Sequence, residues 1–117
     1  MIMECIFCKI IQKEIPAEII YEDKDLLAFR DIHPLAPVHV LIIPKRHIES
    51  VNDFLPADAE ILGRMVLVAK KLAQDLQIAQ KGYKLLFRVG SDGGQEVAHV
   101  HLHLIGGAKL TEGIRPV

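Results

Sequence analysis

The sequence has almost no net charge, no long apolar run and only two cysteines, and each shortage argues against a class of protein. Its 14 basic and 15 acidic residues leave a net charge of −1, which offers no electrostatic footprint for nucleic acid or an anionic membrane surface. No apolar run approaches the roughly 20 residues of a membrane span, and the first residues lack the features of a signal peptide. We therefore expect a cytoplasmic protein without nucleic-acid or membrane partners.

The two cysteines, Cys5 and Cys8, are too close in sequence to staple a fold. A Cys-x-x-Cys pair has three interpretations: a zinc site, a redox dithiol, or two small buried apolar side chains. A structural disulfide is not expected in a reducing compartment.

The pattern of apolar residues predicts one α+β domain over residues 1–117, half of whose residues are hydrophobic. Helical spacing predicts a short helix over 5–13 and a long helix over about 56–77. We expect Asn52 or Asp53 to cap a turn before the long helix, and Met65 or Val66 to meet a second subunit. Strands are predicted over 17–22, 26–30, 39–44, 83–89 and 95–107, so the order β-β-β-α-β-β indicates an antiparallel sheet.

Three histidines alternate with apolar residues in the run 95–107. In a strand they would share one face, with His99 and His103 about 13 Å apart, which is too far to ligate one ion easily. The run is a surface accident, a metal site or a metal-free reaction centre, and we favour the last. Imidazole is a good nucleophile toward phosphorus, and a neighbouring imidazole can protonate a leaving group. The glycine-rich segment 90–94 suits phosphate oxygens, so the combination predicts phosphoryl or nucleotidyl transfer.

Residues 93–107, Gly-Gly-Gln-Glu-Val-Ala-His-Val-His-Leu-His-Leu-Ile-Gly-Gly, resemble the signature of the histidine triad superfamily. The resemblance is closer to its nucleotide-binding branch, the purine nucleoside phosphoramidases, and it extends over most of the chain before Gly107. It includes Ile6-Phe7-Cys8-Lys9-Ile10-Ile11, Leu27-Ala28-Phe29-Arg30-Asp31-Ile32 and Ile43-Pro44-Lys45-Arg46-His47-Ile48. It implies a HIT-like fold with about five antiparallel strands, one long helix and a short N-terminal helix. It also implies a homodimer, a purine nucleotide ligand and no organic cofactor.

The resemblance implies a role for each residue of the site. His101 would attack the α-phosphorus of a nucleoside 5′-phosphoramidate, such as an AMP-amine or an aminoacyl-adenylate-like substrate. His103 would contact the phosphate and the scissile bridge, and His99 and His39 would support these two rings. Asp31 would accept hydrogen bonds from the ribose. The purine would be walled by Ile6, Phe7, Phe29, Ile32 and Leu41, and the phosphate would lie near Arg88, Gly94, Gln95, Glu96 and Val97.

Three features distinguish the sequence from its relatives or extend the site. Arg88 stands where the branch usually has Asn, and the tail 108–117 lacks the usual aromatic-proline ending, so the leaving-group preference is not implied. Some superfamily members resemble Cys2His2 zinc proteins, and here the ligands would be Cys5, Cys8, His47 and His99. Two alternative functions remain: a dinucleoside polyphosphate hydrolase, and a nucleotide-binding regulatory module without significant turnover.

Overall fold

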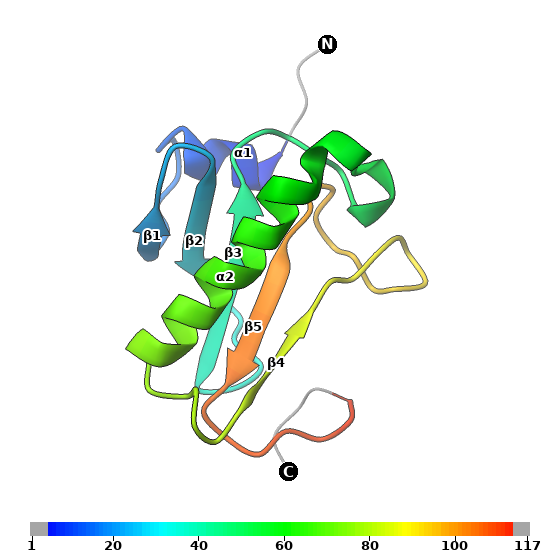
Figure 1. Ribbon diagram of the computed structural model, residues 1–117. Helices are drawn as coiled ribbons and strands as arrows, with labels where there is room; N and C mark the ends of the chain where they lie inside the picture. Colours follow the sequence, from blue (N-terminus) through cyan, green and yellow to red (C-terminus); the bar gives the residue numbers. More distant parts are fainter. Residues whose placement is uncertain (1–4, 114–117) are drawn as a thin grey trace.

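The computed structural model describes residues 5–113, and it consists of an antiparallel sheet with a helix on each face (Figure 1). The five strands are β1 (Ile19–Glu22), β2 (Leu26–Arg30), β3 (Val38–Pro44), β4 (Tyr83–Leu86) and β5 (Leu102–Gly106), in the order β1-β2-β3-β5-β4. The helices are α1 (Ile6–Ile11) and α2 (Ala59–Asp75), with short 3-10 helices η1 (Val51–Asp53) and η2 (Pro56–Asp58) before α2. The α+β class and the antiparallel sheet are confirmed. Residues 1–4 and 114–117 of the predicted domain lie outside the described residues.

Alternating side chains give the sheet two different apolar faces. One face packs against α2, through Leu26, Ala28, Val40, Ile42, Leu102 and Leu104. The other face packs against α1, through Leu27, Phe29, Leu41 and Ile43. Because His103 of β5 is paired with Leu41 of β3, its side chain lies on the α1 face. The strand register therefore decides on which side of the sheet the His103 ring lies.

Helix α2 buries one side against the sheet and leaves the other exposed. Met65 has no exposed surface and packs among residues of the α2 face. The prediction that Met65 meets a second subunit is therefore wrong, because a side chain already enclosed by the core has no surface left to offer. Val66 is 42% exposed and Leu67 is 62% exposed.

The histidine-containing strand is shorter than predicted. Strand β5 begins only at Leu102, so His99 and His101 precede it and the prediction of one strand over 95–107 is wrong. Extending the observed pairing of Leu102 with Ile42 would place Val100 opposite Pro44, which has no N–H for a ladder. The Val100 N–H instead donates to the Ile48 carbonyl at 2.6 Å. The backbone is thus free to turn the two upstream imidazoles in different directions.

The region before α2 is held by a side chain other than the predicted caps. Ser50 is the N-cap of η1, where its hydroxyl accepts from the Asn52 N–H and the Asp53 carboxylate accepts from the Ser50 N–H. Asp53 thus closes a capping box and neither it nor Asn52 is the N-cap itself.

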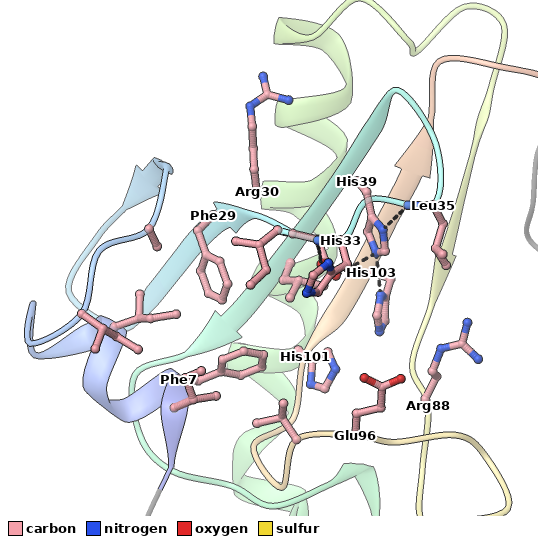
Figure 2. Close-up of a pocket in the computed structure, with 18 of the residues that line it drawn as sticks. Phe7, Phe29, Arg30, His33, Leu35, His39, Arg88, Glu96, His101 and His103 are labelled. Atoms are coloured by element: carbon pink, nitrogen blue, oxygen red, sulfur yellow. Dashed lines mark hydrogen bonds and ion pairs between the residues drawn. The ribbon is translucent and has the colours of Figure 1, made fainter.

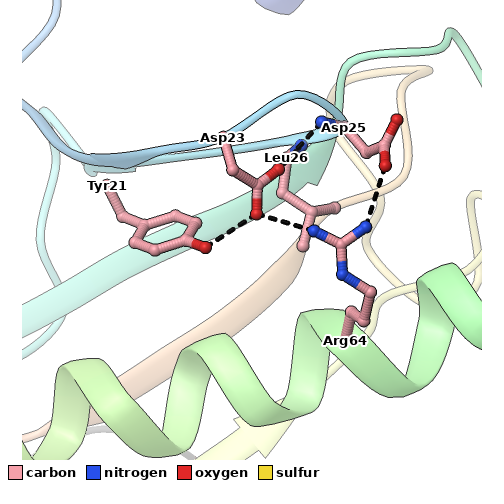
Figure 3. A network of polar contacts seen from close by, with 5 residues as sticks. All are labelled: Tyr21, Asp23, Asp25, Leu26 and Arg64. Atoms are coloured by element: carbon pink, nitrogen blue, oxygen red, sulfur yellow. Dashed lines mark hydrogen bonds and ion pairs between the residues drawn. The ribbon is translucent and has the colours of Figure 1, made fainter.

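An ion-pair network joins α2 to the turn between β1 and β2 (Figure 3). The Arg64 guanidinium donates to the carboxylates of Asp23 and Asp25, each at 2.8 Å. Asp23 also accepts from the Tyr21 hydroxyl at 2.7 Å and from the N–H of Leu26 at 2.8 Å. One carboxylate therefore orders the turn and fastens it to the helix.

Within residues 5–113, neither helix has the length and apolar character that crossing a bilayer requires.

Candidate active site

A cavity of about 650 Å³ opens on the α1 face of the sheet, a size typical of small-molecule sites. Figure 2 shows Phe7 and Phe29 at one end and Arg88 and Glu96 at the other, with His101 between them. The cavity thus has an apolar end, an imidazole-lined middle and a charged end.

Most of the predicted site residues line this cavity. They are Ile6, Phe7, Phe29, Asp31, Ile32, His39, Leu41, Arg88, Gly94, Glu96, Val97, His101 and His103. The lining also contains residues that sequence reasoning missed, namely Ile10, Ile15, Pro16, Ala17, Arg30, His33 and Leu35. Ile10 and Ile15 look like ordinary core positions in the sequence, so only their three-dimensional neighbours distinguish them.

A chain of hydrogen bonds fixes the tautomers of His39 and His103. The Leu35 N–H donates to His39 Nδ1 at 3.1 Å, so the proton of the neutral His39 ring lies on Nε2. That Nε2 is 2.9 Å from His103 Nδ1 and donates to it. His103 must then carry its own proton on Nε2, a buried atom with no hydrogen-bond partner among the described residues. This series of hydrogen bonds therefore ends in the His103 Nε2–H, which is available to a ligand.

His101 is oriented by a separate hydrogen bond. Its Nδ1 lies 2.7 Å from the backbone carbonyl of His99 and donates to it. In the neutral ring Nε2 therefore keeps its lone pair. The His101 and His103 ring centroids are 4.9 Å apart, so a nucleophilic nitrogen and a donor N–H can reach adjacent atoms of one ligand.

Burial keeps these imidazoles uncharged. It lowers the pKa of His103 to about 3, with the neighbouring His101, His39 and Arg88 acting in the same direction. Burial also lowers the pKa of His101 and of His39, and the positive charge of Arg88 contributes in both cases. At neutral pH the rings are therefore uncharged and each keeps one nitrogen lone pair, which a nitrogen nucleophile requires.

The glycine-rich loop presents only part of the predicted phosphate site. The N–H groups of Gly94 and Gln95 donate to the carbonyls of Ser91 and Gly90. The Gln95 side chain bonds to Glu49 and Val97 carbonyls and to the Gly90 N–H, and Gln95 does not line the cavity. The N–H groups of Glu96 and Val97 have no acceptor among residues 5–113. The loop thus uses its first amides to hold its own shape and leaves the next two for a ligand.

Asp31 lies beside the histidine pair. Its Oδ1 accepts from the His33 N–H at 2.8 Å, which orders the loop after β2. Its Oδ2 is 3.5 Å from His39 Nε2, and the residue is only half-buried. One carboxylate oxygen is thus committed to the loop, while the other faces the cavity.

The second cluster brings together Cys5, Cys8, His47 and His99, whose ligand atoms all lie within 4.8 Å of one another. Cys5 Sγ is 3.4 Å from His99 Nδ1, and Cys8 Sγ is 3.3 Å from His47 Nδ1 and 3.6 Å from His99 Nδ1. Tetrahedral zinc with ordinary Zn–S and Zn–N bonds would separate S and N ligands by roughly 3.6 Å. The four residues therefore lie close enough to bind one metal ion.

The surroundings of His99 favour the protonation state that a metal ligand needs. His99 Nε2 donates to the Pro44 carbonyl at 2.8 Å, which leaves Nδ1 unprotonated toward the two sulfurs. Burial lowers the pKa of His99 to about 4 and, in the metal-free cluster, raises the pKa of Cys8 to about 11. His99 does not line the cavity, so its ring belongs to this cluster and only its carbonyl reaches His101.

The antiparallel sheet, the His-x-His-x-His segment that enters its fourth-placed strand and the cavity beside it define a histidine triad protein. The profile of the HIT domain matches residues 12–110. The chain belongs to the HIT domain family, which confirms the resemblance found in the sequence.

Individual relatives are similar to this protein over nearly the whole chain. The purine nucleoside phosphoramidase of Escherichia coli K12 is 50% identical over 107 residues, which is 92% of this chain and 90% of the relative. A HIT family hydrolase from Legionella pneumophila is 55% identical with a TM-score of 0.91, covering 93% of this chain and 97% of the other. A histidine triad protein from Clostridium difficile is 42% identical with a TM-score of 0.91, covering 96% and 97%.

Proposed function

We propose that the protein hydrolyses purine nucleoside 5′-phosphoramidates, cutting the P–N bond through a nucleotidyl intermediate on His101. The observation that supports this proposal most directly is that both tautomers are fixed. His101 holds its proton on Nδ1 against the His99 carbonyl, and His103 has beside it an Nε2–H without a partner among the described residues. The name of the E. coli relative supplies the substrate class.

The cavity accommodates such a substrate in one direction. The base would lie between the apolar side chains that line the Phe7 and Phe29 end, where aromatic faces favour stacking. Asp31 would accept hydrogen bonds from the ribose hydroxyls. The phosphate would then lie beside His101, with the free N–H groups of Glu96 and Val97 as donors to its oxygens.

The reaction divides into two steps. In the first, His101 Nε2 attacks phosphorus and the P–N bond breaks, while the His103 Nε2–H donates a hydrogen bond to the departing nitrogen, which takes up a solvent proton and leaves as an amine. In the second, water attacks the nucleotidyl phosphorus and releases a proton to solvent, and His101 leaves as a neutral ring with the nucleoside monophosphate. The Nδ1–H bond to the His99 carbonyl stabilises the imidazolium that exists between the steps.

The decisive experiment offers adenosine 5′-phosphoramidate to the wild type and to His101→Asn. We expect the wild type to release AMP and ammonia, and the variant to lose turnover while still binding AMP in calorimetry. Equal turnover by both proteins would refute the nucleophile assignment. Faster cleavage of diadenosine polyphosphates than of phosphoramidates would favour the rival hydrolase, and binding without turnover by the wild type would favour a regulatory module.

We also propose that Cys5, Cys8, His47 and His99 hold a structural zinc ion. Bound zinc would join α1 to the chain after β3 and to the segment before β5. About one zinc per chain is expected by metal analysis, together with a lower melting temperature after chelation. Cys8→Ser should lose the metal. Wild-type protein without zinc whose thiols titrate freely would contradict the proposal. We further propose that the protein is cytoplasmic, because cysteine thiols stay reduced in that compartment and remain able to bind a metal.

A homodimer through α2 and β4 is the third proposal. Strand β4 is at the edge of the sheet, and Leu85 on it is 37% exposed. Val66 and Leu67 on α2 are exposed apolar side chains as well. Light scattering after gel filtration should give twice the chain mass, and Leu67→Lys together with Leu85→Lys should give the monomer mass. A monomeric wild type would exclude the proposal.

A further inference from the structure

The polarity of the cavity gives the bound substrate a direction. With the base at the apolar end and the phosphate beside His101, the group on the other side of the P–N bond must extend toward the charged end. That end is formed by Arg88 and Glu96, which Figure 2 shows on the far side of the histidines from Phe7 and Phe29. These two side chains are therefore the ones placed to contact the departing amine.

Arg88 brings a positive charge to this end of the cavity. Its guanidinium makes no hydrogen bond or ion pair with any residue between 5 and 113, although the residue is partly buried and lines the cavity. By contrast, Arg30, Arg46 and Arg64 each contact a carboxylate. Gly94 lies against the Arg88 side chain, since a Cβ at position 94 would be 3.5 Å from its terminal nitrogen. The charge of Arg88 is thus held at the site without a partner from the described protein.

Glu96 restricts which anion can use this charge. Its carboxylate also lines the charged end and is exposed. A doubly charged phosphate on the leaving group would be repelled by it, whereas a single carboxylate could form a bidentate pair with the planar guanidinium at a smaller cost. A neutral leaving group would gain nothing from Arg88.

We propose that Arg88 selects leaving groups that carry a carboxylate next to the departing nitrogen, so the preferred substrates are nucleoside phosphoramidates N-linked to amino acids. The inference rests on the proposed function and adds the chemical class of the leaving group. The reaction stays balanced, because water replaces the P–N bond and the products are a nucleoside monophosphate and a free amino acid.

The test compares two adenosine phosphoramidates, one N-linked to glycine and the other to glycinamide, which replaces the carboxylate by a neutral amide. The kcat/KM ratio of glycine to glycinamide substrate is measured for the wild type and for Arg88→Gln, Arg88→Lys and Glu96→Gln. The two amines differ in intrinsic reactivity, but this difference is the same for every enzyme form and cancels when the ratios are compared. Circular dichroism melting verifies that each variant is folded.

We expect Arg88→Gln to lower the ratio about tenfold or more, the range of a lost charge-assisted hydrogen bond. Arg88→Lys, which keeps the charge, should retain part of the preference, and Glu96→Gln should increase it. An unchanged ratio in Arg88→Gln would overturn the inference, since Arg88 would then contact only the scissile phosphate. A loss in Arg88→Lys as large as in Arg88→Gln would also overturn it. Failure of the wild type to cleave either compound would instead refute the proposed function.

Discussion

Burial of an uncharged His103 makes the stability of the fold depend on pH. Its pKa is about 3 in the folded protein and about 6.5 in the unfolded chain. Between these values the unfolded state binds a proton that the folded state does not. Stability therefore falls as the pH decreases below 6.5, by about 1.4 kcal/mol per pH unit for one proton. Between pH 6.5 and pH 4.5 this amounts to roughly 2 to 3 kcal/mol.

The perturbation that isolates this effect is His103→Asn, because the Asn Oδ1 can replace the ring Nδ1 as acceptor for the His39 N–H. The variant should be less stable than the wild type at pH 7, since packing is lost. The gap in unfolding free energy should narrow by roughly 2 to 3 kcal/mol at pH 4.5, because the variant no longer has the unfavourable titration.

Urea unfolding followed by circular dichroism at pH 7, 6, 5 and 4.5 measures the gap, with a chelator in every sample so that metal release adds no protons. Met65→Ala is the control, because Met65 does not titrate and lies on the opposite face of the sheet. Its gap should stay constant over this range. If the His103→Asn curve also ran parallel to the wild type, the conclusion that His103 is buried in its neutral form would be wrong.

Three further predictions concern the scaffold. Met65→Ala should cost about 2 to 5 kcal/mol of unfolding free energy in urea, because Met65 is fully enclosed; a loss below 1 kcal/mol would contradict the packing. Gly93→Ala should weaken AMP binding in calorimetry, since the alanine Cβ would meet the Val89 carbonyl oxygen and displace the loop. Unchanged affinity would contradict the idea that AMP binding depends on the shape of this loop. Arg64→Met should lower stability by only about 1 kcal/mol, because its ion pairs are partly exposed; a loss above 3 kcal/mol would assign the network a larger role.

The succession of strands and helices along the chain follows from the sequence because it depends on local pattern. The runs around Leu26 and Ile42 have the length and composition of buried strands, and α2 has an apolar stripe at helical spacing. The same reasoning failed at His99 and His101. Whether that segment continues a strand depends on its neighbour, and the neighbour here is Pro44, which cannot extend the ladder.

The candidate site, like the fold, was predicted from the sequence only in part. The histidine pattern and the resemblance pointed to the residues around the cavity and to the four possible metal ligands. They could not reveal which Gln95 and Gly94 donors are already used inside the loop, because hydrogen-bond partners are known only from the fold. Which atoms donate and which accept in the hydrogen bonds from Leu35 through His39 to His103 is likewise known only from the fold.

The register of β5 restricts how the gene can change in length. Because His103 and Leu104 point to opposite faces, deleting one residue inside β5 would exchange a reactive ring with a core side chain. Insertions and deletions should therefore not be tolerated within β5. The loop that joins β4 to β5 carries both the charged end of the cavity and His101, so leaving-group preference can evolve or be engineered there by substitution at Arg88 and Glu96 and not by a change in loop length.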